Sequence, residues 1–263
     1  MIRRYVRLLA LQLRMSAAAG MAYRADFILE GVMAFAWTFL TLLPLWVLFD
    51  QRETVAGWDF PSALVVIAYF TAVKAVMESV VSPSAVDLVE RIRSGSFDYM
   101  LLKPVDAQVM MSGSRLEPWQ ILDLLFAIGI ATYAFIERGT APAPADIGLG
   151  ILLFIAGCVA MYALWFALAA VAFWVVRLDN LPFLLGAIFD TARWPVQVFP
   201  KLWRFLFTFV IPIAVMTTYP AMALLGEIDA TTTLAVLGGS LGMLIVCRLV
   251  WRSAIRNYTS ASS

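Results

Sequence analysis

Long apolar runs constrain the fold of this chain more than any other feature of its sequence. A helix needs about 20 apolar residues to cross the roughly 30 Å hydrocarbon core of a bilayer. The run from Phe27 to Phe49 is long enough, and Glu30 is its only charged residue. Further runs of suitable length predict spans at about 61–81, 119–136, 147–176 and 231–251.

The overall composition makes lipid the solvent for much of the surface. Of the 263 residues, 62% are hydrophobic and 14% are charged, against about 45–50% and about 25% in soluble domains. A soluble chain with a mean hydropathy of +0.86 would leave a large apolar area in water. The net charge of +1 predicts no nucleic-acid partner, whereas membrane lipids are expected partners.

Lysine and arginine are concentrated in alternate connections between the apolar runs. The intervening connections hold only Arg52 and Arg138. Because basic residues are retained on the cytoplasmic side, both termini and the connection after the second run are predicted to be cytoplasmic. This requires an even number of spans, and six fit. The cytoplasmic basic residues are Arg3, Arg4, Arg7, Arg14, Arg24, Arg91, Arg93, Lys103, Arg115, Arg248, Arg252 and Arg256.

The stretch 181–225 is apolar but interrupted by prolines, and its span has two interpretations. A span at about 203–224 would leave the basic residues before it in the cytoplasm. Alternatively the span covers 181–198, and residues 200–225 fold back into the outer leaflet as a re-entrant hairpin. Proline-broken backbone is tolerated at membrane depth where it is buried in protein or lines a cavity. Both interpretations give six crossings.

Residues 1–25 are predicted to form an amphipathic helix in the cytoplasmic interface. At helical spacing Ile2, Val6, Leu9 and Leu13 form one apolar stripe, and the arginines lie away from it. Such a helix places its apolar side in lipid and its arginines among anionic head groups. A cationic tail without fixed structure is the alternative. The segment lacks the compact apolar core and cleavage site of a signal peptide.

The missing residue types exclude most enzymatic chemistry. The chain contains no histidine and two cysteines, so it lacks the commonest general base and the usual zinc ligands. We therefore expect no catalytic residue, no metal site and no cofactor in this chain. It also lacks the glycine-rich G-x-x-x-x-G-K-[ST] phosphate loop of an ATPase, so a separate protein or an ion gradient must supply energy for any transport.

The connection at 82–118 is the longest between the apolar runs. Apolar residues at helical spacing predict a short amphipathic helix over 86–93, and Gly95 stands where a helix C-cap glycine belongs. An apolar patch follows over 97–102 and ends at Pro104. A short helix parallel to the membrane, charged on one side, suits docking against a soluble partner. The alternative is a connector that merely covers helix ends.

Two stretches of the chain have the form of defined motifs. The first, in the 82–118 connection, is Arg91-Ile-Arg-Ser-Gly-Ser-Phe-Asp-Tyr-Met-Leu-Leu-Lys-Pro104. The second appears as Trp194-Pro-Val-Gln-Val-Phe-Pro200, Phe209-Val-Ile-Pro212 and Pro220-Ala-Met-Ala-Leu-Leu-Gly226. Both resemble motifs of ABC-2 type transporter permeases, in particular the branch of roughly 260 residues, whose loop motif reads I-x-x-G-x-(hydrophobe)-D-x-x-L-x-(K/R)-P. The resemblance covers most of the chain.

The resemblance implies the permease subunit of an ATP-driven exporter in a bacterial-type inner membrane. Such permeases pair as homodimers or heterodimers and bind two copies of a cytoplasmic ATPase, which holds ATP and magnesium. The loop at 82–118 would be the coupling helix, and 200–225 the hairpin facing outside. By carry-over, Pro195, Pro200 and Pro212 belong to the outer gate. The expected ATPase-coupling residues are Asp87, Glu90, Arg91, Arg93, Gly95 and Asp98.

Ionisable residues within the spans give candidates for a polar pathway, because such groups in hydrocarbon are costly and usually face protein or water. Lys74 and Glu78 are four residues apart and can pair on one helix face. Asp123 and Glu30 lie near the cytoplasmic ends of their spans. A helix-stabilising pair or a head-group contact is the structural alternative.

The same residues keep a second function open. An ion-gradient-driven secondary transporter could use Lys74, Glu78 or Asp123 as its ion site, although the halves of the chain show no convincing repeat. A membrane enzyme acting on lipid would need clustered carboxylates, which the sequence lacks. Close helix packing is predicted at Gly238 with Gly242 and at Ala156 with Ala160, within the subunit or across a dimer.

Overall fold

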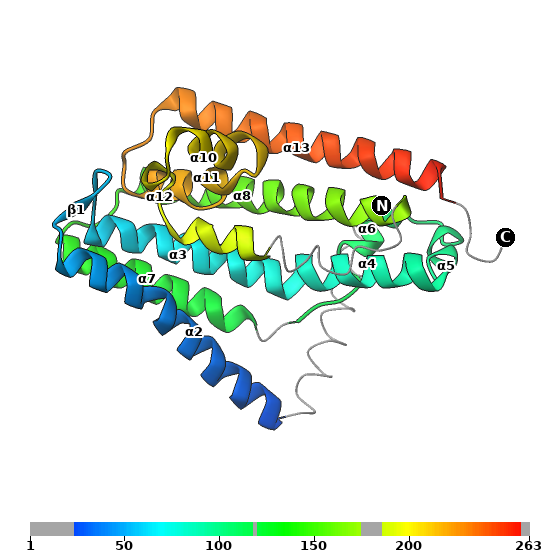
Figure 1. The fold of residues 1–263 in the computed structure, drawn as a ribbon, viewed down its shortest axis with the longest axis horizontal. Helices are drawn as coiled ribbons and strands as arrows, with labels where there is room; N and C mark the ends of the chain where they lie inside the picture. The colour runs from blue at the N-terminus through cyan, green and yellow to red at the C-terminus, as the bar shows by residue number, and fades with distance from the viewer. Residues whose placement is uncertain (1–23, 118–119, 175–185, 259–263) are drawn as a thin grey trace.

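The structure, a computed structural model, describes residues 24–117, 120–174 and 186–258, and these form an almost entirely helical bundle (Figure 1). Its long helices other than α2 lie side by side, whereas α2 meets the bundle at one end and diverges from it towards the other. Short connections lie at one end of the bundle, here called the β1 end after strand β1 (Thr54–Val55). The 82–117 connection lies at the other, here called the α5 end after helix α5 (Asp98–Leu101). The long helices are α2 (Arg24–Asp50), α3 (Phe60–Val76), α7 (Ile121–Arg138), α8 (Pro144–Ala170) and α13 (Ala230–Arg256).

A two-stranded hairpin joins α2 to α3 at the β1 end. Strands β1 (Thr54–Val55) and β2 (Trp58–Asp59) pair antiparallel, and Gly57 adopts the left-handed φ of +87° in the tight turn between them. Asp59 then caps α3, because its carboxylate accepts the backbone N–H of Ser62 at 3.1 Å. The start of the second predicted span is therefore fixed by a turn and a cap.

α3 does not end where the second span was expected to end. It passes through a π-helical turn, η1 (Met77–Val81), into α4 (Ser82–Ser94), and the three form one helix of 35 residues. The Ser82 N–H donates to the Met77 carbonyl, five residues back. Pro83 follows without an N–H to donate, and the wider π turn before it lets the helix continue. The expectation of a separate short helix parallel to the membrane is corrected: the amphipathic segment extends the helix of the second span.

Three helices among the described residues are long and apolar enough to cross a bilayer. They are the α3–α4 helix, α8 with its 3-10 end η3 (Val171–Phe173), and α13. A pair of helical segments, Lys201–Val210 and Ile213–Leu224, gives a fourth if its 65° bend lies within one span. α2 and α7 occupy the expected first and third spans. A nearly all-α chain with several helices suited to crossing a membrane is confirmed, and the count of six crossings stays a prediction.

The proline-rich segment near the β1 end is broken into short helices. Figure 1 shows α10, α11 and α12 gathered near the β1 end of the bundle instead of running along its length. This placement favours the re-entrant hairpin, although residues 181–185 of the span that would precede it lie outside the described residues. The elements are η4 (Asp190–Arg193), η5 (Val196–Val198), α10 (Lys201–Phe205), η6 (Leu206–Val210), α11 (Ile213–Met216) and α12 (Thr218–Leu224).

α8 forms the centre of the bundle, and small residues let its neighbours approach closely. A Cβ added to Gly157 would lie 2.9 Å from the Met216 Cα, so the α11 backbone rests directly on α8. Ala156 and Ala160 are buried, as expected of a packing face. In contrast, a Cβ on Gly238 or Gly242 would meet no described atom within 4 Å. The α13 pair therefore packs against no described part of this chain.

Candidate functional site

The predicted coupling segment forms the α5 end of the bundle. α4 ends at Gly95, whose left-handed φ of +73° and N–H bond to the Ile92 carbonyl form the expected C-cap. Two short helices follow, α5 (Asp98–Leu101) and α6 (Ala107–Met111). The glycine thus reverses the chain and places α5 beyond the end of the long helix.

The six predicted coupling residues all lie at this end, in different settings. Asp87 and Arg91 pair with each other on α4, with 2.8 Å between the carboxylate and the guanidinium Nε. Glu90 and Arg93 are exposed on α4, and Asp98 is half-buried at the start of α5. Glu90 and Arg93 are therefore the most exposed charged members of the set.

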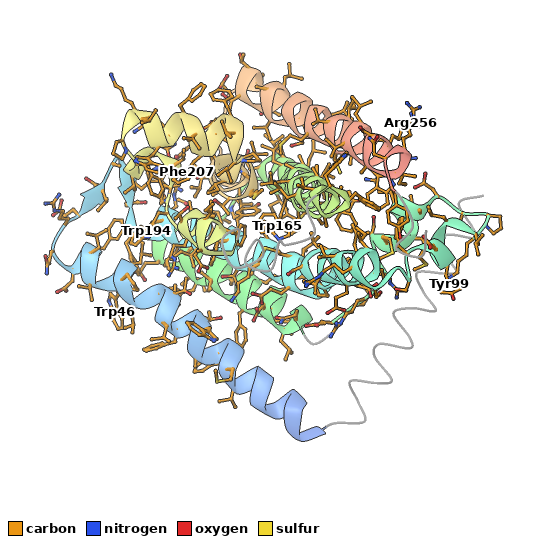
Figure 2. The ribbon with its side chains drawn as sticks, turned by 45° about the vertical axis from the view of Figure 1, so that its right-hand side comes forward. Trp46, Tyr99, Trp165, Trp194, Phe207 and Arg256 are labelled. Carbon is orange, nitrogen blue, oxygen red and sulfur yellow. The ribbon has the colours of Figure 1, made fainter. Side chains whose placement is uncertain are left out.

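The apolar stretch after Gly95 divides into an inner and an outer face. Phe97 is fully buried and Met100 is 7% exposed. Tyr99, Leu101 and Leu102 face outward, with exposures of 72%, 41% and 80%, and Figure 2 shows Tyr99 projecting from the tip of the bundle. We call these three outward residues the α5 patch. It is an exposed apolar surface on an otherwise charged connection.

Phe97 anchors the α5 end in an aromatic cluster. Its ring centre lies 5.2 Å from that of Phe173, 6.2 Å from Trp251 and 5.5 Å from Tyr258, all in near-perpendicular edge-to-face geometry. Burial, followed by the nearby Asp98 carboxylate, raises the pKa of Tyr258 to about 12. The cluster fixes the turn after α4 to the end of α8 and to the end of α13.

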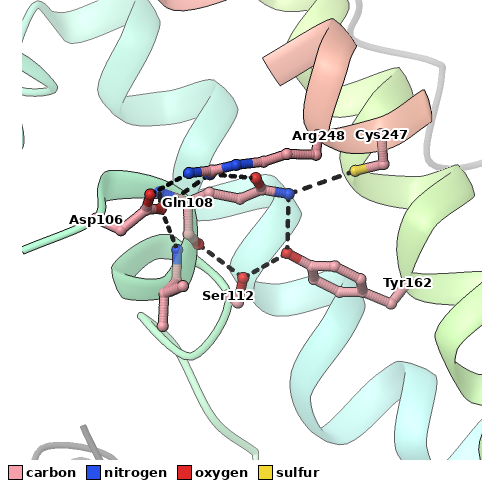
Figure 3. A network of polar contacts seen from close by, with 7 residues as sticks. Asp106, Gln108, Ser112, Tyr162, Cys247 and Arg248 are labelled. Atoms are coloured by element: carbon pink, nitrogen blue, oxygen red, sulfur yellow. Dashed lines mark hydrogen bonds and ion pairs between the residues drawn. The ribbon is translucent and has the colours of Figure 1, made fainter. Parts of the chain in front are cut away.

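A polar network ties α6 to α13 beside this cluster (Figure 3). The Arg248 guanidinium forms a two-pronged ion pair with Asp106; one of its bonds measures 3.0 Å. Asp106 also caps α6 by accepting the N–H groups of Gln108 and Val109 at 3.0 and 3.2 Å. Hydrogen bonding to Arg248 is the main reason that the pKa of Asp106 lies below its usual range.

The network continues through Gln108 into α8. The Gln108 side-chain oxygen accepts from Arg248 at 2.7 Å, and its nitrogen donates to the Tyr162 hydroxyl at 3.3 Å and reaches the Cys247 sulfur at 3.5 Å. The Ser112 and Tyr162 hydroxyls share a bond of 2.6 Å. No local sequence pattern predicts this network, because Asp106 and Arg248 are 142 residues apart.

Three of the four predicted polar-pathway residues line one cavity of about 540 Å³. Lys74 and Glu78 come from α3 and η1, and their charged atoms are 3.7 Å apart, as their spacing predicted. Asp123 comes from the first turn of α7. The side chain of Glu30 lies outside the described residues. The rest of the lining is Met33, Trp37, Leu40, Thr41, Phe70, Met77, Glu117, Gln120, Leu122, Gly186, Phe189, Asp190 and Arg193.

Asp123 differs from the other charged residues of this cavity in its burial and hydrogen bonding. Its side chain is only 4% exposed, and its Oδ1 has no hydrogen-bond partner among the described residues. An ionised group in such a place is costly unless it is paired. The sequence marked Asp123 as a charge near the end of a span, but it gave no sign that Asp190 and Arg193 would join the same cavity.

The three predicted gate prolines each start a helical piece near the β1 end. Pro195 precedes η5, Pro200 precedes α10, and Pro212 stands between η6 and α11. Two buried threonines bind the backbone beside them: Thr217 donates to the Ala192 carbonyl at 2.9 Å, and Thr218 accepts the Val196 N–H at 3.1 Å. These bonds satisfy backbone groups that proline-broken helices leave open.

Comparison with known proteins gives one family. A family model described as an ABC-2 family transporter protein matches residues 35–262. That range contains α4 to α6, the proline-rich segment and every lining residue of the polar cavity except Met33. No curated protein matches the chain.

Proposed function

The chain belongs to the ABC-2 family of transporter proteins, and from this premise we propose that it is the permease subunit of an ATP-driven exporter. Two permease copies, or this chain and a related one, form the path between them. Each pair binds two copies of a cytoplasmic ATPase, which supplies the ATP and magnesium chemistry, since this chain has no phosphate loop. The chain itself makes and breaks no covalent bond.

The observation that carries this proposal is the combination of an exposed tip and a rigid base at the α5 end. The α5 patch offers apolar surface to a soluble partner. Directly beneath it, the Phe97 cluster and the Asp106–Arg248 pair attach the segment to α8 and α13. Movement of an ATPase against the patch would thus be passed to two of the long helices.

The arrangement of the connections supports the proposed orientation. The 82–117 connection and the end of α13 lie at the same end of the bundle, and both are rich in arginine. We place this end in the cytoplasm on the basis of the positive-inside rule, in a bacterial-type inner membrane with six crossings and both termini inside. The proline-rich segment near the β1 end would then face outside and form the outer gate.

The α13 glycines offer a place for a second permease copy. A Cβ added to Gly238 or Gly242 would meet no described atom within 4 Å, so there is open space beside both glycines. Exposed small residues at this spacing let a second helix approach closely in a bilayer. We therefore propose the dimer as the working unit.

Co-purification tests the central part of this proposal. The tagged chain is expected to bring an ATPase subunit with it in detergent and in nanodiscs. Tyr99→Ala should weaken that association. Tyr133→Ala should not, because Tyr133 is also exposed, at 53%, but belongs to α7 away from the α5 patch. If no ATPase accompanies the wild-type chain in any membrane mimic, the proposal fails.

The polar cavity favours one alternative function, an ion-gradient-driven secondary transporter. Lys74, Glu78 and Asp123 lie together in it, as a coupling site for an ion would require. The purified chain would then transport under a gradient without any ATPase. Transport that depends on added ATPase and ATP would exclude this alternative.

A further inference from the structure

The charges that the described residues bring to the polar cavity do not balance. These residues contribute four carboxylates and two basic groups to the lining, which gives them a formal charge of −2. Arg115, just outside, approaches Glu117 to 4.0 Å and reduces the excess to one negative charge. The four carboxylates are Glu78, Glu117, Asp123 and Asp190, and the two basic groups are Lys74 and Arg193.

The excess charge is located at Asp123. Arg193 lies 3.9 Å from Asp190, and Lys74 lies 3.7 Å from Glu78. The Lys74 charge also acts on Asp123. One ammonium group is therefore the counter-ion of two carboxylates, those of Glu78 and Asp123. Asp123 is left with a buried oxygen that has no hydrogen-bond partner among the described residues. A second positive charge in the cavity would complete the set.

The other walls of the cavity are aromatic and apolar. Phe70 and Phe189 stack with 5.2 Å between ring centres, and Met33 and Met77 line the space beside them. Trp37, on α2, also lines the cavity and is 57% exposed. Aromatic faces attract organic cations as well as apolar groups.

We propose that this cavity binds an organic cation, an apolar or aromatic body that carries one positive charge, with Asp123 as its counter-ion. The volume of about 540 Å³ suits a drug-sized molecule. An inorganic cation fits less well, because the described residues include no group of three potential metal ligands placed together and hard cations need several oxygen ligands. The inference rests on the proposed permease function, since it treats the cavity as part of the transport path.

Two probes of the same shape and opposite charge test the inference on the full chain in nanodiscs. Tetraphenylphosphonium should bind saturably in equilibrium dialysis, whereas tetraphenylborate should neither bind at this site nor compete. Asp123→Asn should weaken tetraphenylphosphonium binding by about 30-fold or more, as expected when a buried charge loses its partner. Trp37→Leu should weaken it about two- to fivefold through loss of a cation–aromatic contact.

Two further variants keep the test decisive. Glu137→Gln removes an exposed carboxylate at the other end of α7 and should leave binding unchanged. Asp123→Glu keeps the charge and should preserve the preference for the cation. If Asp123→Asn does not fold, the Trp37→Leu result decides. Equal binding of both probes, or unchanged affinity in both Asp123→Asn and Trp37→Leu, overturns the inference.

The same preparations separate this inference from the proposed function. If an ATPase co-purifies with the chain but the cation probe shows no selective binding, only the cavity assignment is wrong. If the probe binds selectively but no ATPase is found, the permease proposal fails and the cavity assignment stands.

Discussion

The α5 end and the polar cavity both contain charged residues from several helices. They differ in how completely the carboxylates are paired and hydrogen-bonded. At the α5 end, Asp106 meets Arg248 and two backbone N–H groups. In the cavity, Asp123 is buried with an unpartnered oxygen among the described residues. A completed network holds its elements in one arrangement, while an incomplete one leaves a place for a group that arrives from outside.

The largest expected difference between the two regions concerns their aromatic residues. Phe97→Ala should lower the free energy of unfolding by about 3–5 kcal/mol, since it removes a fully buried ring. Trp37→Ala in the cavity wall should cost less than about 1 kcal/mol, because Trp37 is mostly exposed. Thermal unfolding followed by size-exclusion chromatography would measure both. Equal losses of stability in the two variants would contradict the distinction between the rigid Phe97 cluster and the open cavity wall at Trp37.

An isosteric substitution at the α5 end should give the next largest change in the free energy of unfolding. Asp106→Asn leaves Arg248 without its counter-ion and should destabilise the chain by about 1–2 kcal/mol, less than a fully buried pair because both side chains are about one-third exposed. A double-mutant cycle with Arg248→Met isolates the coupling between them. A coupling energy near zero would show that the network does not fix α6 to α13.

Lowering the pH should remove the stabilisation that the Asp106–Arg248 ion pair provides. The pKa of Asp106 is lowered in the folded chain, so its ion pair stabilises the fold above its unfolded pKa of about 4. The stabilisation is lost as the pH falls through the lower, folded pKa. Between pH 6 and pH 3 the wild-type melting temperature should therefore fall more than that of Asp106→Asn. Parallel curves would contradict the role given to the pair.

Asp123→Asn should change the free energy of unfolding least, and in the opposite direction to the variants above. Asp123→Asn removes a buried charge that lacks a hydrogen-bond partner among the described residues, so the stability without ligand should stay constant or rise by up to about 1 kcal/mol. The same melting assay measures this change. A loss as large as that of Asp106→Asn would mean that Asp123 is structurally satisfied and would weaken the cavity assignment.

Features set by neighbouring residues could be predicted from the sequence. Apolar runs located the long helices, and Gly95 marked the end of α4 because the left-handed C-cap favours glycine. The spacing of Lys74 and Glu78 gave their pairing on one helix face. The continuation of α3 into α4 was missed, because a π turn before Pro83 leaves no clear signature in the sequence.

Features set by distant residues could not be predicted. Asp106 and Arg248 each look like an ordinary surface charge until the fold places them together across 142 positions. Phe97 belongs to a recognised motif, but its aromatic partners come from the ends of α8 and α13. The cavity likewise depends on Asp190 and Arg193 packing beside α3 and α7. The candidate residues could therefore be predicted from the sequence more successfully than the residues they contact.

Site-specific photo-crosslinking tests the central claim most directly. A photoreactive residue placed at Leu102, which is 80% exposed in the α5 patch, should form an adduct with the co-purifying ATPase. The same residue placed at Tyr133 on α7 should form none. An ATPase adduct at position 102 alone is the predicted result. No adduct at 102, or equal adducts at both positions, would contradict the assignment of the α5 end as the ATPase-coupling surface.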